Sequence, residues 1–378
     1  MADTRKPRIV VGTMTGTSID GLDVAIMEVQ GRGLGLSARL LQHGTSPLGP
    51  LAPDLRKLAE QVPASTGEIA RIAHAFGTLH AEAICDTLTS AGLTPEDPEL
   101  IALHGQTVFH APPLSWALLD TSPITQRLPC TIVSNLRAND LGAGGQGAPI
   151  TPLADWILFR SASPRSIVNL GGFCNVTNLP AADDGPEGIT GGDVCPCNHL
   201  LDAEARNTLG TPFDQDGAHA LQGSVDEALA CRIQDAIGSD SAQDFERSLG
   251  TGDEMTRALA PLGGLARGED RLATVVDAVA RSIAASLKGA TDTCFFGGGL
   301  RNLALQAALR RHLDHEGIQF KHPSIQPEAR EACAMAVLGT IARDGEAITL
   351  PAVTGRCDKT THLDGLWCLA SQPDFTDP

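Results

Sequence analysis

Two short apolar runs near the start of the chain are separated by a loop of small and polar residues. The apolar runs cover residues 9–11 and 24–26, and the loop between them is rich in glycine, threonine and serine. Asp20 and Asp23 follow the loop. This pattern predicts a strand, a tight loop and a second strand over residues 8–30. A loop of this kind is equally typical of an ordinary turn that binds nothing.

Farther along the chain, short apolar runs alternate with longer stretches whose apolar residues recur at helical spacing. Strands are predicted over residues 100–103, 131–133, 166–170 and 293–296. Helices are predicted over residues 66–90, 198–207, 224–237, 271–290 and 328–342, and from residue 302 onward. The stretch after Leu350 shows no such periodicity and is expected to be irregular. Alternating strands and helices favour an α/β fold.

The length of the chain favours two domains. It has 378 residues, of which 42% are hydrophobic and 19% charged, so a sizeable core is expected. The glycine-rich stretch Leu141–Pro149 is the expected junction. We therefore expect an N-terminal domain over residues 1–140, completed by residues 345–378, and a C-terminal domain over residues 141–344.

The charge of the chain argues against two classes of partner. It carries 28 basic and 45 acidic residues, a net charge of −17, which disfavours binding to nucleic acid or to an anionic membrane. We expect no transmembrane helix and no secretory signal, because no long apolar run is present and the first seven residues are polar. The ten cysteines are expected to be free thiols in the cytoplasm.

Three glycine-rich loops follow predicted strands. They contain Gly12–Ser18, Gly171-Gly172 and Gly297–Gly299, the last preceding a helix that begins near Asn302. Backbone N–H groups in such loops bind phosphate, and Mg²⁺ that accompanies a phosphate takes oxygen ligands such as Asp20. Each loop alone is also typical of a turn without a ligand, but three together favour a nucleotide site. The G-x-G-x-x-G dinucleotide fingerprint is not present.

The segment TGGDVCPCNHLLD offers two kinds of chemistry. Asp193 lies before a predicted helix and is expected in a loop, where it is either a general base or a capping aspartate. Cys195, Cys197 and His199 form a C-x-C-x-H cluster typical of a metal protein. No second pair of ligands with zinc-site spacing is visible, which disfavours that alternative.

Several other polar residues are positioned to line a site. His104 follows a predicted strand, and Arg137 precedes the glycine-rich stretch, where a guanidinium can hold a carboxylate in a bidentate contact. Glu331 opens the last predicted helix. The alternatives are a buried histidine, a surface ion pair and a solvated glutamate.

Taken together, these segments resemble the anhydro-N-acetylmuramic acid kinase family, a branch of the sugar kinase and actin superfamily. The resemblance runs in order along nearly the whole chain. It rests on GTMTGTSIDGLD (12–23), HGQTVFH (104–110), RAND with GGQGAP (137–149), NLGGFCN (169–175), DGA (216–218), GGGLRN (297–302), EA (331–332) and PAVTG (351–355).

The resemblance implies a two-domain, actin-like ATPase fold with a central nucleotide cleft, and ATP and Mg²⁺ as cofactors. The implied substrate is a small anhydro-sugar, 1,6-anhydro-N-acetylmuramic acid. Water, activated by Asp193, opens the 1,6-anhydro bridge, and O6 receives the γ-phosphoryl group. The product, N-acetylmuramic acid 6-phosphate, belongs to cell-wall recycling. A cytoplasmic homodimer is also implied.

The resemblance further implies a role for each matching residue. Asp20 lies near Mg²⁺. Residues around the phosphates are Gly12, Thr15, Gly16, Thr17, Ser18, Gly171 and Gly172, while Gly297, Gly298, Gly299 and Asn302 hold the nucleoside. Residues around the sugar are His104, Gln106, Arg137, Asp140, Asn198 and Glu331.

The chain departs from the family in the segment that carries Asp193. The family sequence D-T-G-P-G-N is D-V-C-P-C-N here, so Val194 replaces a threonine and Cys195 and Cys197 replace glycines. A cysteine adds a side chain where the backbone of the family approaches a ligand. Two alternatives therefore stay open: a kinase for another anhydro-sugar such as levoglucosan, and a binding homologue with weakened catalysis.

Overall fold

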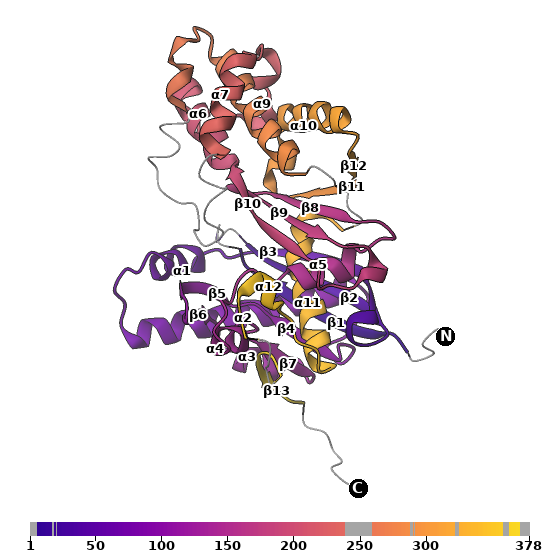
Figure 1. Ribbon diagram of the computed structural model, residues 1–378. Coiled ribbons are helices and arrows are strands. Elements are labelled where there is room, and N and C mark those ends of the chain that lie inside the picture. Colours follow the sequence, from indigo (N-terminus) through magenta and orange to yellow (C-terminus); the bar gives the residue numbers. More distant parts are fainter. Residues whose placement is uncertain are drawn as a thin grey trace, which may run out of the picture. The chain divides into compact units, whose positions relative to one another are not determined.

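The computed structural model describes residues 6–16, 19, 21–238, 259–287, 290, 292–321, 325–357 and 363–370 (Figure 1). The chain forms two compact units. The first unit comprises the residues up to Phe159 together with those from Glu328 onward, and the second comprises Arg160–Pro327. The expected boundaries were 140/141 and 344/345. The observed boundaries differ from the expected ones because the helices that begin at Pro152 and Arg330 pack against each other within the first unit.

A six-stranded sheet forms the centre of the first unit, in the order β13-β7-β4-β1-β2-β3. The predicted hairpin is confirmed, since β1 and β2 pair antiparallel with Val11 opposite Ile26. β3 continues antiparallel, while β4 and β7 add in parallel on the other side of β1. The strands are β1 (Arg8–Met14), β2 (Gly21–Gln30), β3 (Ser37–Pro47), β4 (Leu100–Leu103), β7 (Thr131–Ser134) and β13 (Leu366–Cys368). A separate ribbon pairs β5 (Gln106–Ala111) with β6 (Leu114–Leu118).

Helices cover both faces of this sheet, which explains why the central strand β4 is apolar and buried along its whole length. On one face, α2 packs into a core that includes Phe76 and Ile84. The long α2 begins at a capping box made by Ser65 and Glu68. On the other face, α11 packs against β1, β2 and β4. The helices are α1 (Leu51–Ala59), α2 (Thr66–Ser90), α3 (Ser122–Arg127), α4 (Ala138–Gly142), α5 (Pro152–Phe159), α11 (Arg330–Arg343) and α12 (Pro351–Thr354).

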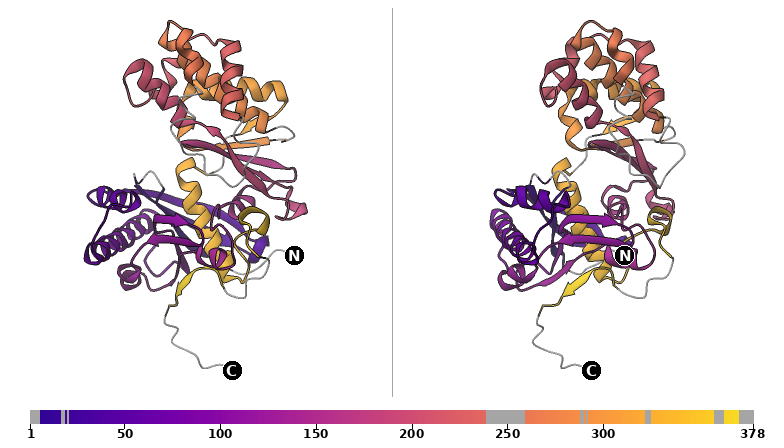
Figure 2. Two further views of the ribbon diagram at one scale, coloured as in Figure 1. Left: turned by 60° about the vertical axis from the view of Figure 1, so that its left-hand side comes forward. Right: turned by 90° about the vertical axis from the view of Figure 1, so that its left-hand side faces the viewer.

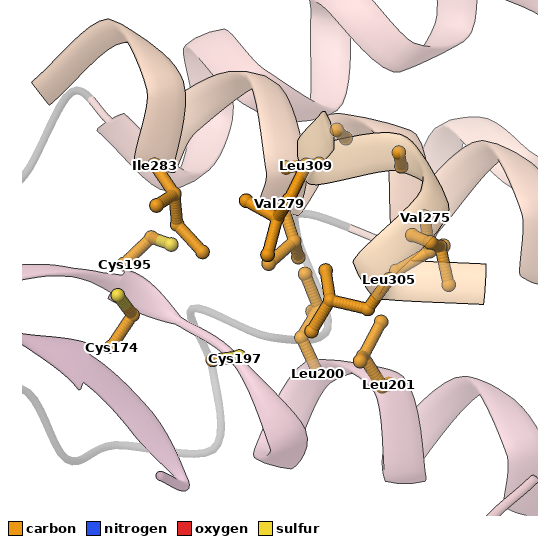
Figure 3. Packing of buried hydrophobic residues seen from close by; sticks show 14 of the residues in the cluster. Cys174, Cys195, Cys197, Leu200, Leu201, Val275, Val279, Ile283, Leu305 and Leu309 are labelled. Carbon is orange, nitrogen blue, oxygen red and sulfur yellow. The ribbon is translucent and has the colours of Figure 1, made fainter. Parts of the chain in front are cut away.

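The second unit has a five-stranded sheet in the order β10-β9-β8-β11-β12. The helices of its described part gather on one side of it (Figures 1 and 2). The strands are β8 (Arg165–Leu170), β9 (Phe173–Leu179), β10 (Thr190–Pro196), β11 (Asp292–Phe296) and β12 (Gln319–Lys321). The helices are α6 (Asn198–Leu209), α7 (Glu227–Gly238), α9 (Gly268–Ser286) and α10 (Leu303–Glu316). Their apolar faces meet Cys174, Cys195 and Cys197 in a continuous core (Figure 3).

The two units repeat one topology. In each sheet, the first strand pairs antiparallel with the second and the second with the third. The fourth strand pairs parallel with the first, and the fifth pairs parallel with the fourth. The α/β class is confirmed, and this is the two-domain actin-like fold that the resemblance implies. The prediction that the chain is irregular after Leu350 is wrong, because α12 forms there and β13 pairs with β7.

Two further observations bear on the nature of the protein. Within the described ranges, no helix combines the length and the apolar character needed to span a membrane. All ten cysteines lie in the described part of the chain, and each is a free thiol, as expected.

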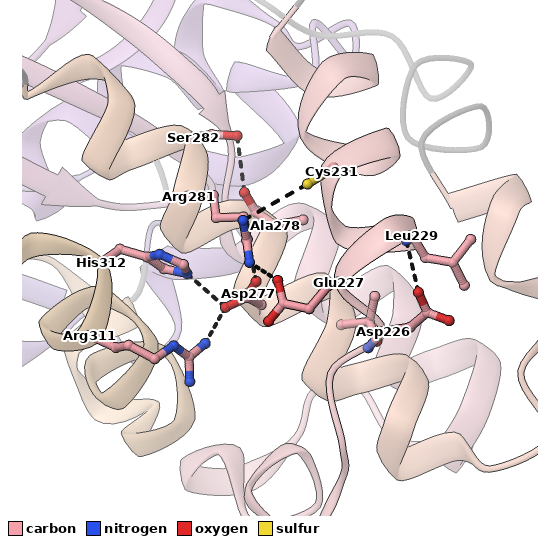
Figure 4. Close-up of polar contacts among 11 residues, drawn as sticks. Asp226, Glu227, Leu229, Cys231, Asp277, Ala278, Arg281, Ser282, Arg311 and His312 are labelled. Atoms are coloured by element: carbon pink, nitrogen blue, oxygen red, sulfur yellow. Dashed lines mark hydrogen bonds and ion pairs between the residues drawn. The ribbon is translucent and has the colours of Figure 1, made fainter. Parts of the chain in front are cut away.

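An ionic cluster joins three helices of the second unit around Asp277 (Figure 4). The carboxylate of Asp277 is 1% exposed and accepts hydrogen bonds from Arg281 Nε at 2.5 Å and His312 Nε2 at 2.8 Å, and from Arg311. Arg281 also pairs with Glu227 on α7. Burial alone raises the pKa of Asp277, but the hydrogen bonds from Arg281 and His312 outweigh burial and hold it below its usual value.

We expect Asp277→Asn to lower the free energy of unfolding at pH 7 by about 2 kcal/mol, because charge-assisted hydrogen bonds are lost. The folded-state pKa of Asp277 is depressed, so its stabilisation is complete above the unfolded pKa of about 3.9 and disappears as the pH falls through the folded value. Denaturant unfolding at several pH values measures this difference. Glu28→Gln, which breaks the exposed pair with Arg39, is the control and is expected to cost under about 1 kcal/mol. Equal losses in the two variants would contradict the prediction.

Candidate active site

The turn after β1 carries the first glycine-rich loop. Thr15 is buried, and the amide of Ile19 donates to the carbonyl of Gly16 at 3.2 Å. Thr17, Ser18 and Asp20 lie outside the described residues, so their phosphate and Mg²⁺ roles stay predictions. Gly12 lies within β1, where a Cβ atom would be 2.0 Å from the carbonyl oxygen of Ala332 on α11. Close packing against α11 therefore accounts for Gly12, and its phosphate role stays a prediction.

Among the described residues, five of the nine buried side-chain polar atoms without a partner lie in or just after β1, β4 and β7. The amide of His104 donates to the carbonyl of Thr13 at 3.2 Å, which brings these segments together. An unsatisfied buried polar group costs about 1–3 kcal/mol, so such a concentration is typical of a site that binds a polar ligand. The atoms are Thr13 Oγ1, Thr15 Oγ1, His104 Nδ1, Gln106 Oε1 and Arg137 Nε.

The imidazole of His104 is neutral. Burial, with a further contribution from the positive charge of Arg137, lowers its pKa to about 3. Arg137 Nη2 lies 3.3 Å from His104 Nε2. Because a guanidinium only donates, Nε2 accepts and the imidazole proton is assigned to Nδ1. His104 therefore presents a buried N–H donor to this site.

Arg137 and Asp140 hold the glycine-rich loop in place. Arg137 Nη1 donates to the carbonyl of Gly147 at 2.5 Å. The carboxylate of Asp140 is fully buried and accepts from the Gly147 amide at 2.7 Å and from Thr354 Oγ1 at 2.6 Å. Thr354 belongs to the segment PAVTG, for which the sequence suggested no role. Asp140 is thus a structural anchor, and its contact with sugar stays a prediction.

Glu331 lies in the first turn of α11, where several charged groups face it. Burial raises the pKa of its carboxyl, the charges of Arg330 and Arg137 lower it, and those of Asp155 and Asp23 raise it. The charge of Arg137 therefore acts on Glu331, and the contact of both residues with sugar stays a prediction. Nothing in the sequence pattern identified Asp155 as a neighbour.

In the second unit, the turn between β8 and β9 contacts the start of α6. The carbonyl of Gly171 accepts from the amide of Asn198 at 3.1 Å, and that of Gly172 accepts from the amides of Cys197 at 2.8 Å and His199 at 3.1 Å. A Cβ atom on Gly172 would be 2.3 Å from His199 Nε2. A side chain at position 172 would therefore have to displace the imidazole of His199. The phosphate role of both glycines stays a prediction.

Asp193 lies in strand β10, so the expectation of a loop is wrong. The register between β10 and β9 shifts after Asp193: Asp193 is opposite Asn175, while Cys195 is opposite the next residue, Cys174. This β-bulge at Val194 breaks the alternation of faces. As a result, Asp193 is exposed whereas Cys195 is fully buried. Desolvation by the surrounding protein raises the pKa of the Asp193 carboxyl, which suits a general base.

The two cysteines that replace family glycines point into the core. Cys195 and Cys197 are fully buried and pack with Cys174, Leu200 and Ile283 (Figure 3). Burial raises the pKa of both thiols, that of Cys197 to about 12, so they are unreactive. Among the described residues, no group of three or more potential ligands could hold a metal ion, which disfavours the alternative of a Cys/His metal protein.

The third glycine-rich loop joins β11 to α10. A Cβ atom on Gly297 would lie 2.7 Å from Asn169 Oδ1, and one on Gly299 would lie 3.0 Å from Asn198 Oδ1. Asn302 caps α10 by accepting from the amide of Leu305 at 2.9 Å. The structure therefore brings the third loop, including Gly298, against Asn198 at the start of α6. Asn302 follows the loop at the start of α10.

The DGA segment also meets this loop. Asp216 has a positive φ of 56°, and a Cβ atom on Gly217 would lie 2.2 Å from Asn302 Oδ1. Sequence reasoning noted the segment but assigned it no site residue. The available signal was an aspartate and a glycine in succession, which is typical of a left-handed turn.

A family model described as anhydro-N-acetylmuramic acid kinase matches residues 8–366. A protein of that description from Gloeobacter violaceus is 35% identical over 364 residues, covering 92% of this chain and 96% of the relative. One from Chromohalobacter salexigens is 34% identical over 368 residues, with the same shares covered. Among solved structures, the activator of 2-hydroxyisocaproyl-CoA dehydratase from Clostridium difficile matches 89% of this chain and 96% of its own, at 15% identity and a TM-score of 0.45.

We expect Cys195→Gly and Cys197→Gly each to lower the free energy of unfolding by about 1–3 kcal/mol, because each removes a buried side chain and adds backbone freedom. Catalytic turnover is expected to stay within about twofold, since Cys195 on β10 and Cys197 at the start of α6 both lie in the core of the second unit. Thermal denaturation and a turnover assay measure the two effects. Cys357→Ala, at an exposed position, is the control. A large rise in turnover in the glycine variants would show that the sulfur atoms obstruct the site.

Proposed function

The chain belongs to the anhydro-N-acetylmuramic acid kinase family, and we propose that it opens the 1,6-anhydro ring of 1,6-anhydro-N-acetylmuramic acid and phosphorylates O6 with ATP. The product is N-acetylmuramic acid 6-phosphate, an intermediate of cell-wall recycling. The enzyme is thus a phosphotransferase with an alcohol group as acceptor.

The observation that carries this proposal is the exposed carboxylate of Asp193 on the bulged strand β10. In the proposed reaction, Asp193 takes a proton from water while the water oxygen bonds to C1 of the sugar. The C1–O6 bond breaks, and O6 bonds to the γ-phosphorus as the bond to ADP breaks. The environment of Asp193 raises the pKa of its carboxyl, which strengthens it as a base.

The remaining roles divide between the two units. In the first unit, the partly unsatisfied groups of His104, Gln106 and Arg137 are proposed to hold the sugar, together with Glu331. In the second unit, the Gly297–Gly299 loop and Asn302 are proposed to hold the nucleoside. The packed arrangement of that loop with Asn198 supports this role.

Mg²⁺ is proposed to accompany ATP and to neutralise phosphate charge, with Asp20 as the candidate ligand. Asp20 lies outside the described residues. We also propose a cytoplasmic homodimer, as the family resemblance implies. The ten free thiols fit a reducing compartment.

Incubation of the protein with 1,6-anhydro-N-acetylmuramic acid and MgATP is expected to give a product heavier by one water and one phosphoryl group. Mass spectrometry detects it, and Asp193→Asn is expected to reduce its formation by roughly 10²-fold or more while ATP binding is retained. Asp183→Asn, at an exposed position of the same unit, is the matched control. Bound ATP without any product from the wild-type protein would favour the weakened homologue instead.

A kinase for another anhydro-sugar is the second candidate, favoured by the departures in the Asp193 segment. Levoglucosan lacks the lactyl carboxylate of the muramic substrate. Arg137 retains N–H donors beyond the two used for His104 and Gly147, so it can bind that carboxylate. Arg137→Ala is therefore expected to lower kcat/KM on the muramic substrate by about 10-fold or more relative to levoglucosan. Equal losses on both sugars, in parallel kinetic assays, would contradict the role of Arg137.

A further inference from the structure

Two bidentate ion pairs hold the two ends of α11 in the first unit. At its N-terminal end, Arg330 donates from Nε to Asp155 Oδ1 at 2.9 Å and from Nη2 to Asp155 Oδ2 at 2.5 Å. At its C-terminal end, Arg8 donates from Nη1 to Asp344 Oδ1 at 3.0 Å and from Nη2 to Asp344 Oδ2 at 3.2 Å. Bidentate pairs fix orientation as well as distance. The two pairs are chemically alike, but only the first adjoins Glu331.

The pair of Arg330 and Asp155 is buried too deeply to contact a substrate. The side chain of Asp155 is fully buried and that of Arg330 is 7% exposed. Asp155 lies on α5, so the pair fastens the first turn of α11 to a second helix. Since a buried charge is costly without its partner, neither residue can turn away from the other. The backbone of Glu331 is thereby fixed at the point where α11 begins.

The same pair controls the charge beside Glu331. The charged groups that face the Glu331 carboxyl are Arg330 on its own helix, Asp155 on α5, Arg137 at the start of α4 and Asp23 on β2. Asp23 is itself held by His43 Nε2 at 3.0 Å and Thr45 Oγ1 at 2.7 Å. The negative charge of Asp155 offsets that of Arg330, so Glu331 does not sit beside an uncompensated cation.

We propose that Asp155 and Arg330 are positioning residues for Glu331. They fix its direction by fastening the first turn of α11 to α5, and Asp155 balances the cation adjacent to it. This inference rests on the proposed function, because it gives Glu331 a part in the reaction. Nothing in the sequence motif around Glu331 requires a partner at residue 155, which lies 175 positions from Arg330.

The test compares Asp155→Asn with Asp344→Asn, which loosens the other end of the same helix. Both variants are expected to lower Tm. Asp155→Asn is expected to lower kcat on the anhydro-sugar by about 10- to 100-fold, because a small displacement of a substrate residue has effects of that size. ATP affinity, measured by titration, is expected to stay within about twofold of the wild type. Asp344→Asn is expected to leave kcat within about twofold as well.

A pH profile separates positioning from a loss of stability. Removing the negative charge of Asp155 leaves Arg330 uncompensated, so the pKa of Glu331 falls. The part of the acid limb of kcat/KM that Glu331 contributes, beside that of the base Asp193, then moves to lower pH. Asp344→Asn leaves the limb in place. In a Glu331→Gln background, Asp155→Asn is expected to cause no shift, which assigns the effect to Glu331.

Equal losses of kcat in the two aspartate variants, with an unmoved acid limb, would overturn the inference. If Asp155→Asn does not fold, Arg330→Lys keeps the charge and loses the bidentate contact; kcat should then fall while the acid limb stays. Unchanged kcat in a folded Arg330→Lys protein would equally overturn it. Absence of activity in the wild-type protein would instead reject the proposed function, so the two failures are distinguishable.

Discussion

The packing of α11 against β1 is the constraint on which the first unit depends. Every residue from Ala332 to Ala342 is buried, and the helix backbone approaches β1 so closely that Gly12 has no room for a side chain. This close fit fixes α11 relative to the hairpin, and with it Glu331 relative to the ends of β1 and β4. The polar groups near those ends can keep unsatisfied atoms because the apolar contacts around them already determine the structure.

Much of the fold could be predicted from the sequence, since a long periodic pattern of apolar residues specifies a helix or a strand without knowledge of its neighbours. The helix over residues 66–90 and the hairpin over residues 8–30 are examples. The strand β10 could not be predicted, because TGGDVCP contains two glycines and no alternation. Strand β13 escaped prediction for another reason. It has only three residues and depends on β7 for its pairing.

The candidate site could likewise be predicted only in part from the sequence. Sequence motifs located His104, Arg137 and Glu331, and the structure brings them together within one unit. Their supporting residues could not be predicted, since Asp155 and Thr354 act through contacts that span more than 170 positions of the chain. A motif shows which residues carry chemistry, whereas the residues that orient them are defined only by tertiary packing.

The bulge at Val194 lets one short strand carry both an exposed carboxylate and a buried core residue. In a regular strand, Asp193 and Cys195 would share a face, and any change at one position would alter the surroundings of the other. The additional residue assigns Asp193 to solvent and the cysteines to the interior. Residues 195 and 197 can therefore be substituted together with other core residues, while the surroundings of the Asp193 carboxylate stay the same. A chain can in this way lose the glycines by which its family is recognised and still retain the group that performs the chemistry.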